Sequence, residues 1–150
     1  MNVMSLLNPK VQVAYLYEDD TIRQGLEKLR HHGYTALPVL TRDGGYAGTV
    51  SEGDFLWYLL EQDDRTLRGQ ERAPLRTILR GEFNPPVDIR VTMEELLERS
   101  MQQNFVPVVD DRGAFVGIVT RQAILRALAA ERERPARLPR HGRAAEAVGA

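Results

Sequence analysis

The sequence contains two copies of one pattern, and this internal duplication constrains the fold more than any other feature. The first copy, DDTIRQGLEKLRHHGYTALPVLTRDGGYAGTVSEGDFLWYLLE, begins at Asp19, and the second, RVTMEELLERSMQQNFVPVVDDRGAFVGIVTRQAILRALAAE, begins at Arg90. Four residue pairs recur at one spacing of 69 positions: Pro38 and Pro107, Gly44 and Gly113, Gly48 and Gly117, and Ser51 and Thr120. Upstream, VMSLL at residues 3–7 corresponds to LRTIL at residues 75–79. Each copy is about half of the chain, and both should fold alike.

An amphipathic helix is predicted near the start of each copy. Thr21 with Gln24, and Thr92 with Glu95, have the spacing of a capping box. Apolar residues then recur on one helical face: Ile22, Leu26 and Leu29 in the first copy, and Met93, Leu97 and Met101 in the second.

A β-hairpin and a second helix follow in each copy. The apolar runs 36–40 and 46–50 are joined by RDGG, and the runs 106–109 and 114–119 by DDRG, where glycine supplies the positive φ of a tight turn. Ser51 and Thr120 then begin helices. The expected fold mixes α and β elements (α+β): two pseudo-symmetric units, each a small sheet with two flanking helices and an extended segment ahead of it. Because one unit is too small for a good core, the two should pack together around a pseudo-two-fold axis, with a ligand cleft between them.

Composition sets the boundaries of these units and excludes several classes of protein. With 150 residues, 43% of them hydrophobic, the chain suits one compact module made of repeat 1 (1–61), a polar connection (62–74), repeat 2 (75–130) and a flexible tail (131–150). The tail carries five arginines but also three glutamates, so nucleic-acid binding is not expected. Without cysteine there is no disulfide framework or thiolate metal site. Without a leader or a long apolar run, the expected protein is cytoplasmic and has no membrane contact.

The tandem pattern h-P-V-h-D-x-x-G-x-h-x-G-h-h-[ST]-x-x-[DN] resembles a pair of CBS domains, often called a Bateman module. GYTALPVLTRDGGYAGTVSEGD and NFVPVVDDRGAFVGIVTRQA carry it, and the resemblance covers roughly residues 3–130. It implies a regulatory protein, not an enzyme, that binds an adenosine-containing ligand such as AMP, ADP, ATP, S-adenosylmethionine or cyclic di-AMP. It further implies a homodimer that acts on a separate partner protein, with no catalytic residues, no metal and no other cofactor.

The resemblance implies two clefts. Cleft one joins the leading segment and first strand of repeat 1 to the turn of repeat 2 at which Thr120 begins a helix. Its expected ligand-binding residues are Lys10, Val11, Gln12, Ala14, Tyr34, Thr35, Ala36, Thr120 and Arg121. Thr120 opens a helix whose free N–H groups favour a phosphate, and Arg121 suits a bidentate phosphate contact. Ala123 stands where a carboxylate that binds the ribose hydroxyls would be expected. The GYTA and TR sequences resemble those of small CBS-pair proteins that bind cyclic di-AMP.

Cleft two joins the leading segment and first strand of repeat 2 to the turn of repeat 1 at which Ser51 begins a helix. Its expected residues are Ser51, Asp54, Val87, Phe105 and Val106, together with Asp88. Asp54 can accept two hydrogen bonds from a ribose diol, as an acidic residue does in dinucleotide folds. Because Glu52 occupies the position of Arg121, this turn has no basic residue, and cleft two should take no ligand or a weakly charged nucleoside.

Each of these residues also has an interpretation without a ligand. Ser51 with Asp54 is equally a helix cap, worth ~1 kcal/mol. Arg121 could be solvated or pair with Asp110 or Asp111, and Thr35 could bond neighbouring backbone.

The function has an alternative too. Trp57 and Tyr58 lie on the second helix of repeat 1, where an interface is expected. The alternative to a nucleotide sensor is therefore a ligand-independent dimerisation or protein-interaction module.

Overall fold

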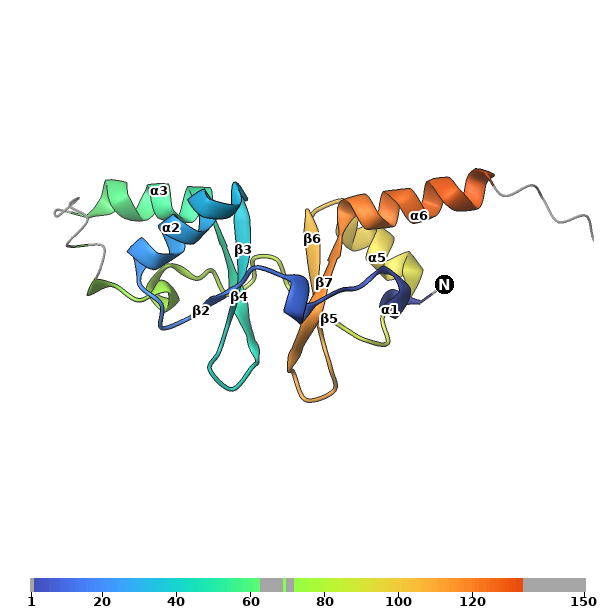
Figure 1. Cartoon of the computed structure of the whole chain (residues 1–150), viewed down its shortest axis with the longest axis horizontal. Coiled ribbons are helices and arrows are strands. Elements are labelled where there is room, and N and C mark those ends of the chain that lie inside the picture. The colour runs from blue at the N-terminus through green and yellow to red at the C-terminus, as the bar shows by residue number, and fades with distance from the viewer. Residues whose placement is uncertain (1, 63–68, 70–71, 134–150) are drawn as a thin grey trace, which may run out of the picture.

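Two small sheets stand side by side in the middle of the molecule (Figure 1). The computed structural model describes residues 2–62, 69 and 72–133. The first sheet has the order β2-β3-β4 and is made of β2 (Leu16–Tyr17), β3 (Ala36–Leu40) and β4 (Tyr46–Ser51). The second has the order β1-β7-β6-β5 and is made of β1 (Asn8–Pro9), β5 (Val87–Asp88), β6 (Phe105–Val109) and β7 (Phe115–Thr120). Both predicted hairpins, β3–β4 and β6–β7, are confirmed as antiparallel pairs.

Two helices accompany each sheet, which confirms the predicted mixed α and β fold (Figure 1). The first sheet has α2 (Ile22–His32) and α3 (Glu52–Glu61), and the second has α5 (Met93–Ser100) and α6 (Arg121–Glu133). The leading segments carry α1 (Val3–Leu6), η1 (Lys10–Gln12) and η2 (Leu75–Ile78). Since α6 continues to Glu133, the expected tail begins with helical residues, and its remainder, 134–150, lies outside the described residues.

The predicted helix starts are confirmed. The Thr21 hydroxyl accepts from the Gln24 N–H at 3.2 Å, and the Gln24 side chain accepts from the Thr21 N–H at 2.8 Å, which completes the capping box. Thr92 likewise accepts from the Glu95 N–H at 3.1 Å. The expected apolar face of α5 was partly wrong. Met101 lies just past the helix and is 79% exposed, whereas Leu96 is fully buried.

The leading segments cross over between the two units. Val3 packs in the second core with Val87, Leu96 and Ile124, whereas Leu75 packs in the first core with residues of repeat 1. Gly117 permits this crossing, because a Cβ there would collide with the Asn8 carbonyl oxygen. At Gly48 the equivalent Cβ would meet only the Leu79 side chain, at 3.1 Å. Each structural unit therefore combines one sequence repeat with the leading segment of the other.

The units also meet where the two hairpins turn. Gly45 and Ala114 form an isolated bridge, and the Phe115 N–H donates to the Gly44 carbonyl at 2.9 Å. The rings of Tyr46 and Phe115 stack with centroids 6.3 Å apart. The pseudo-symmetric pairing of the hairpins thus holds the two sheets next to each other. Within the described part of the chain, no helix combines the length and apolar character that crossing a bilayer requires.

Candidate ligand-binding clefts

A cavity of about 410 Å³ lies between the two units, at the expected position of cleft one. It is lined by Asn8, Gln12, Val13, Ala14, Tyr34, Thr35, Ala36, Leu37, Pro38, Asn104, Phe105, Ile118, Thr120 and Gln122. Six of the residues predicted for cleft one are among them: Gln12, Ala14, Tyr34, Thr35, Ala36 and Thr120. Residues far apart in sequence therefore meet at one cavity, as the duplication requires.

One end of this cavity is the start of α6. The Thr120 hydroxyl accepts from the Ala123 N–H at 3.1 Å, which makes Thr120 the cap of a 13-residue helix. The Arg121 N–H donates to the Asn104 carbonyl at 2.8 Å, so this turn is fixed against the start of β6. Among the described residues, those that line the cavity are uncharged. Negative charge would be favoured at this end by the helix dipole alone.

Three residues predicted for cleft one lie outside its lining. Lys10 places its Nζ 5.5 Å from the centroid of the Tyr15 ring, and Val11 is 92% exposed. Arg121 begins α6, but its Nε donates to the Ser100 carbonyl at 2.6 Å, towards α5. Its Nε therefore contacts the Ser100 carbonyl and neither of the alternative partners, Asp110 and Asp111.

Cleft two contains a buried hydrogen-bond network. Asn84 is 7% exposed, and its Nδ2 donates to the Thr49 hydroxyl at 3.1 Å while its Oδ1 accepts from Gln103 Nε2 at 2.8 Å. The Tyr46 hydroxyl donates to the Asn84 carbonyl at 2.8 Å and lies 2.6 Å from the Thr49 hydroxyl. Burial raises the pKa of Tyr46 to about 12. The network joins β4 of one unit to the leading segment and α5–β6 connection of the other.

The turn of cleft two is engaged by Arg80. The Asp54 carboxylate accepts from the Ser51 N–H at 2.8 Å and from the Ser51 hydroxyl at 3.0 Å. Arg80 Nε lies 2.8 Å from the other carboxylate oxygen, and the guanidinium stacks 3.7 Å from the Phe83 ring centroid. Arg80 supplies the basic group that the turn itself lacks.

The other residues expected in cleft two are dispersed. Val87 and Val106 belong to the second hydrophobic core, and Phe105 lines the cavity of cleft one. Asp88 binds Arg90 at 2.9 Å, and that guanidinium lowers the pKa of the carboxyl.

Sequence reasoning missed residues in both clefts. In cleft one these include Asn8, Asn104, Ile118 and Gln122, and in cleft two Arg80, Phe83, Asn84 and Gln103. Gln103 could have been found, because it stands 69 positions after Tyr34, whereas the same spacing from Thr35 would have placed Asn104 in cleft two. Arg80 and Asn84 have no such signal, since the leading segments match only over VMSLL and LRTIL.

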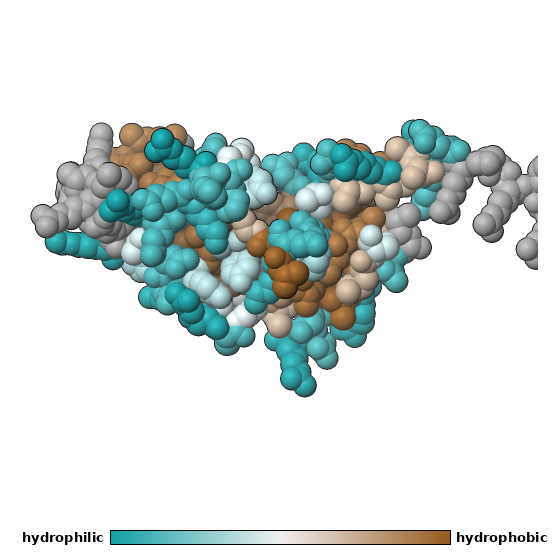
Figure 2. Space-filling view, in the orientation of Figure 1, coloured by the Kyte–Doolittle hydropathy of each residue, from teal (hydrophilic) through white to brown (hydrophobic). Residues whose placement is uncertain are grey.

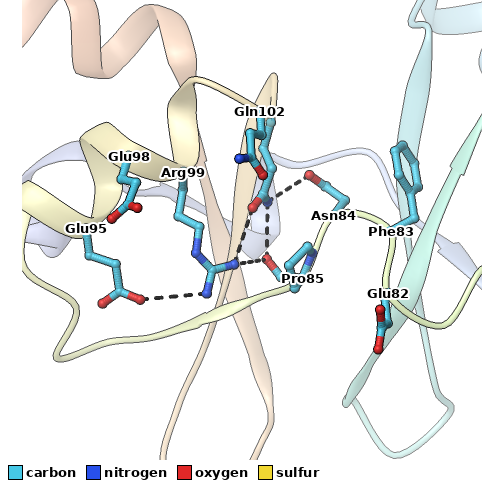
Figure 3. A pocket seen from close by; sticks show the side chains of 9 residues that line it. Glu82, Phe83, Asn84, Pro85, Glu95, Glu98, Arg99 and Gln102 are labelled. Atoms are coloured by element: carbon cyan, nitrogen blue, oxygen red, sulfur yellow. Dashed lines mark hydrogen bonds and ion pairs between the residues drawn. The ribbon is translucent and has the colours of Figure 1, made fainter.

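A larger hollow, about 530 Å³, is lined in part by residues of cleft two, namely Phe83, Asn84 and Gln103 (Figure 3). Glu82, Glu95, Glu98 and Arg99 contribute its charged groups. Arg99 points to the Pro85 carbonyl, at 3.4 Å, and lies 3.7 Å from Glu95. Among the described residues, no group of three or more His, Cys, Asp or Glu side chains is placed to hold a metal ion. The structure gives this hollow no ligand chemistry beyond its own ion pair.

Comparisons with known proteins agree with this architecture. The CBS domain profile matches residues 3–61 and 84–130. A solved structure of CbpB in complex with cyclic di-AMP is 23% identical, with a TM-score of 0.80 over 87% of this chain and 85% of that one. A CBS domain protein of Streptococcus pneumoniae is 27% identical, with a TM-score of 0.79 over 87% and 88% of the two chains.

A third structure, CBSX2 in complex with AMP, is 21% identical, with a TM-score of 0.71 over 88% and 98% of the two chains. CBSX2 is a CBS-pair protein of Arabidopsis thaliana. At these identities CbpB and CBSX2 show the fold. The two profile matches fall on the two sequence repeats and together cover well over half of the residues. The chain therefore belongs to the CBS domain family, as a protein built from one CBS pair.

Proposed function

We propose that this CBS pair is a regulatory protein that binds an adenine nucleotide in cleft one and reports its presence to a partner protein. The observation that carries the proposal is the cavity between the units, which is built from both repeats and ends at the capped start of α6. Its volume of about 410 Å³ lies within the usual range of small-molecule sites, about 300–1,000 Å³. A helix start offers N–H groups and a favourable dipole to a phosphate.

The lining favours a particular kind of nucleotide. Apolar surface from Val13, Phe105 and Ile118 suits a purine, and neutral polar groups such as Thr35 and Gln12 suit its edges. Ala123 occupies the position equivalent to Asp54, so the vicinal hydroxyls of a free ribose have no carboxylate there. Cyclic di-AMP, whose 3′-oxygens are esterified, loses nothing by that exchange, and cyclic di-AMP is the ligand of the CbpB structure. AMP, ADP and ATP, of which AMP is the ligand of the CBSX2 structure, are the other candidates.

A binding protein regulates only if its ligand distinguishes two states. The exposed apolar residues Leu56, Trp57 and Leu60 of α3, with Leu125 of α6, offer a surface through which homodimers or a regulated partner would respond. Figure 2 shows apolar atoms gathered over the α3 end of the molecule. We assign these helices the output of the module and assign it no catalytic step.

That same surface favours a second candidate, a dimerisation module that needs no ligand. Trp57 is 63% exposed and Leu56 is 54% exposed, which is unusual for large apolar side chains on one helix. If this candidate is correct, Trp57→Ala changes the mass measured by light scattering, whereas nucleotides change neither mass nor stability.

Calorimetric titration with AMP, ATP, S-adenosylmethionine and cyclic di-AMP separates the two candidates. We expect at least one of them to bind cleft one with a Kd well below 1 mM, and a nucleotide at 100 times its Kd to stabilise the fold by ~2.7 kcal/mol. If none binds below about millimolar, the proposed function fails.

Two matched variants then assign the cleft. Thr120→Ala removes the hydroxyl that lines cleft one at the start of α6 and should weaken binding about tenfold, or ~1.4 kcal/mol. Asp54→Ala lies in the other cleft and should change the Kd little. The reverse order would contradict the assignment to cleft one.

A further inference from the structure

Asp54 is the residue of cleft two that would recognise a ribose, and its acceptor positions are already in use. The carboxylate is 8% exposed. One oxygen accepts from the Ser51 N–H and hydroxyl, and Arg80 approaches it to 3.4 Å; the other oxygen lies 2.8 Å from Arg80 Nε. A ribose diol would need the same lone pairs.

Arg80 is fixed on its other face as well. Its guanidinium stacks on Phe83, and a cation over an aromatic ring adds to the charge-assisted hydrogen bonds to Asp54. The next residue, Asn84, takes a left-handed conformation with φ of 56°. Its side chain enters the buried network with Thr49 and Gln103. The segment 80–84 is therefore attached to the first unit at two points, on α3 and on β4.

We infer that the segment 80–84 is a built-in occupant of cleft two, in which Arg80 takes the place of a ribose on Asp54. The chain then binds one adenine nucleotide per CBS pair, in cleft one. This inference rests on the proposed function, from which it takes adenine nucleotides as the class of ligand. Arg80, Phe83 and Asn84 thereby become residues that set the ligand stoichiometry.

The competition favours the protein's own arginine. A ribose offers two neutral donors, whereas Arg80 offers a full positive charge in the same chain, without the loss of freedom that a separate ligand suffers on binding. A nucleotide also brings phosphate charge towards Glu52, the first residue of α3. Because the charge of Arg80 is already paired with Asp54, it does not offset Glu52, and cleft two rejects the ligand mainly through the occupancy of Asp54.

The test is the stoichiometry of AMP binding, because AMP has the free diol that Asp54 could read. Calorimetry on the full chain compares the wild type with Arg80→Gln, with the double variant Arg80→Ala/Phe83→Ala, and with that double variant carrying Asp54→Asn. We expect one AMP per chain in the wild type, a second in the double variant, and loss of only the added site with Asp54→Asn. Arg76→Gln, which removes a cation from the same leading segment, should leave the stoichiometry unchanged.

Each outcome decides the inference separately from the proposed function. If the wild type binds no AMP but the double variant gains one Asp54-dependent site, the inference stands while AMP is removed from the candidates for cleft one. If the wild type already binds two AMP and Asp54→Asn removes one, the inference is overturned. It is also overturned if the double variant unfolds as cooperatively as the wild type yet gains no site. Should the double variant fail to fold, Arg80→Gln decides in the same way, because the Arg80 side chain is 52% exposed and its replacement leaves the core intact.

Discussion

The two clefts occupy equivalent places in one pseudo-symmetric fold, yet their linings differ. The cavity of cleft one has an uncharged lining, whereas in cleft two Arg80 occupies the carboxylate of the turn and a hydrogen-bond network links the units. The register of the leading strands aligns Val13 with Asn84, and the repeat aligns Ile118 with Thr49 and Phe115 with Tyr46. In cleft two, Asn84, Thr49 and Tyr46 hydrogen-bond to one another. In cleft one their counterparts are apolar and form no such bonds. The hairpins pair in the same register, so these three side chains account for much of the difference between the clefts, together with the Arg80 and Asp54 pair.

This comparison shows how duplication can separate two roles. A buried polar group must be paired, so the polar set of cleft two fastens the units together. Apolar side chains at the same positions leave space that a purine can fill. One copy of the junction stabilises the pair, and in the proposed function the other copy holds the ligand.

The largest effect is expected where the crossing segments pass the two glycines. In Gly117→Ala the new Cβ meets the backbone of Asn8, which cannot move without displacing β1, whereas in Gly48→Ala it meets only the Leu79 side chain. We expect Gly117→Ala to lower the free energy of unfolding by about 3 kcal/mol and Gly48→Ala by about 1 kcal/mol. Urea denaturation measures both, and equal losses would contradict the difference in packing.

Much of this fold could be predicted from the sequence, because its signals are local. The capping box at Thr21 and the glycine turns at Gly44 and Gly113 place helices and hairpins without knowledge of the core. The crossover of the leading segments could not be predicted in this way. VMSLL and LRTIL are both apolar, and Val3 and Leu75 would fill either core equally well on composition alone.

The site was predictable in part, for a similar reason. Thr35 and Thr120 are found from the motif, and the structure brings them to one cavity. The direction of Arg121 towards Ser100 depends on where α5 packs, and the reach of Arg80 to Asp54 depends on the crossover. Contacts between elements that are distant in sequence leave no pattern in a single chain.

Removing Asn84 from the network should have the next largest effect. Asn84→Gly keeps the left-handed backbone at no steric cost, so it isolates the loss of the amide. Thr49 and Gln103 each lose one buried hydrogen bond, although Thr49 keeps the Tyr46 hydroxyl and Gln103 keeps the Pro85 carbonyl. We expect a loss of about 2 kcal/mol in the free energy of unfolding. Asn84→Ala should cost about 1 kcal/mol more, because alanine disfavours this conformation. Val13→Ala, at the matching position of cleft one, is the control and should cost less than Asn84→Gly; a larger loss there would break the comparison.

The smallest effect is expected from Tyr46→Phe, which gives cleft two the phenylalanine that cleft one has at the equivalent position, Phe115. The pKa of Tyr46 is raised to about 12 by burial, above its unfolded value near 10, so the folded state favours the neutral phenol. Its contribution to stability is complete below pH 10 and is lost as the pH rises from 10 towards 12, because only the unfolded chain ionises there. Urea denaturation should show that the free energy of unfolding of the wild type falls between pH 8 and pH 10.5. In Tyr46→Phe this fall should be smaller by up to about 1 kcal/mol. At pH 8 the same variant loses about 1 kcal/mol from the Asn84 and Thr49 bonds. An unchanged decline in Tyr46→Phe would show that the phenol is not held neutral by cleft two.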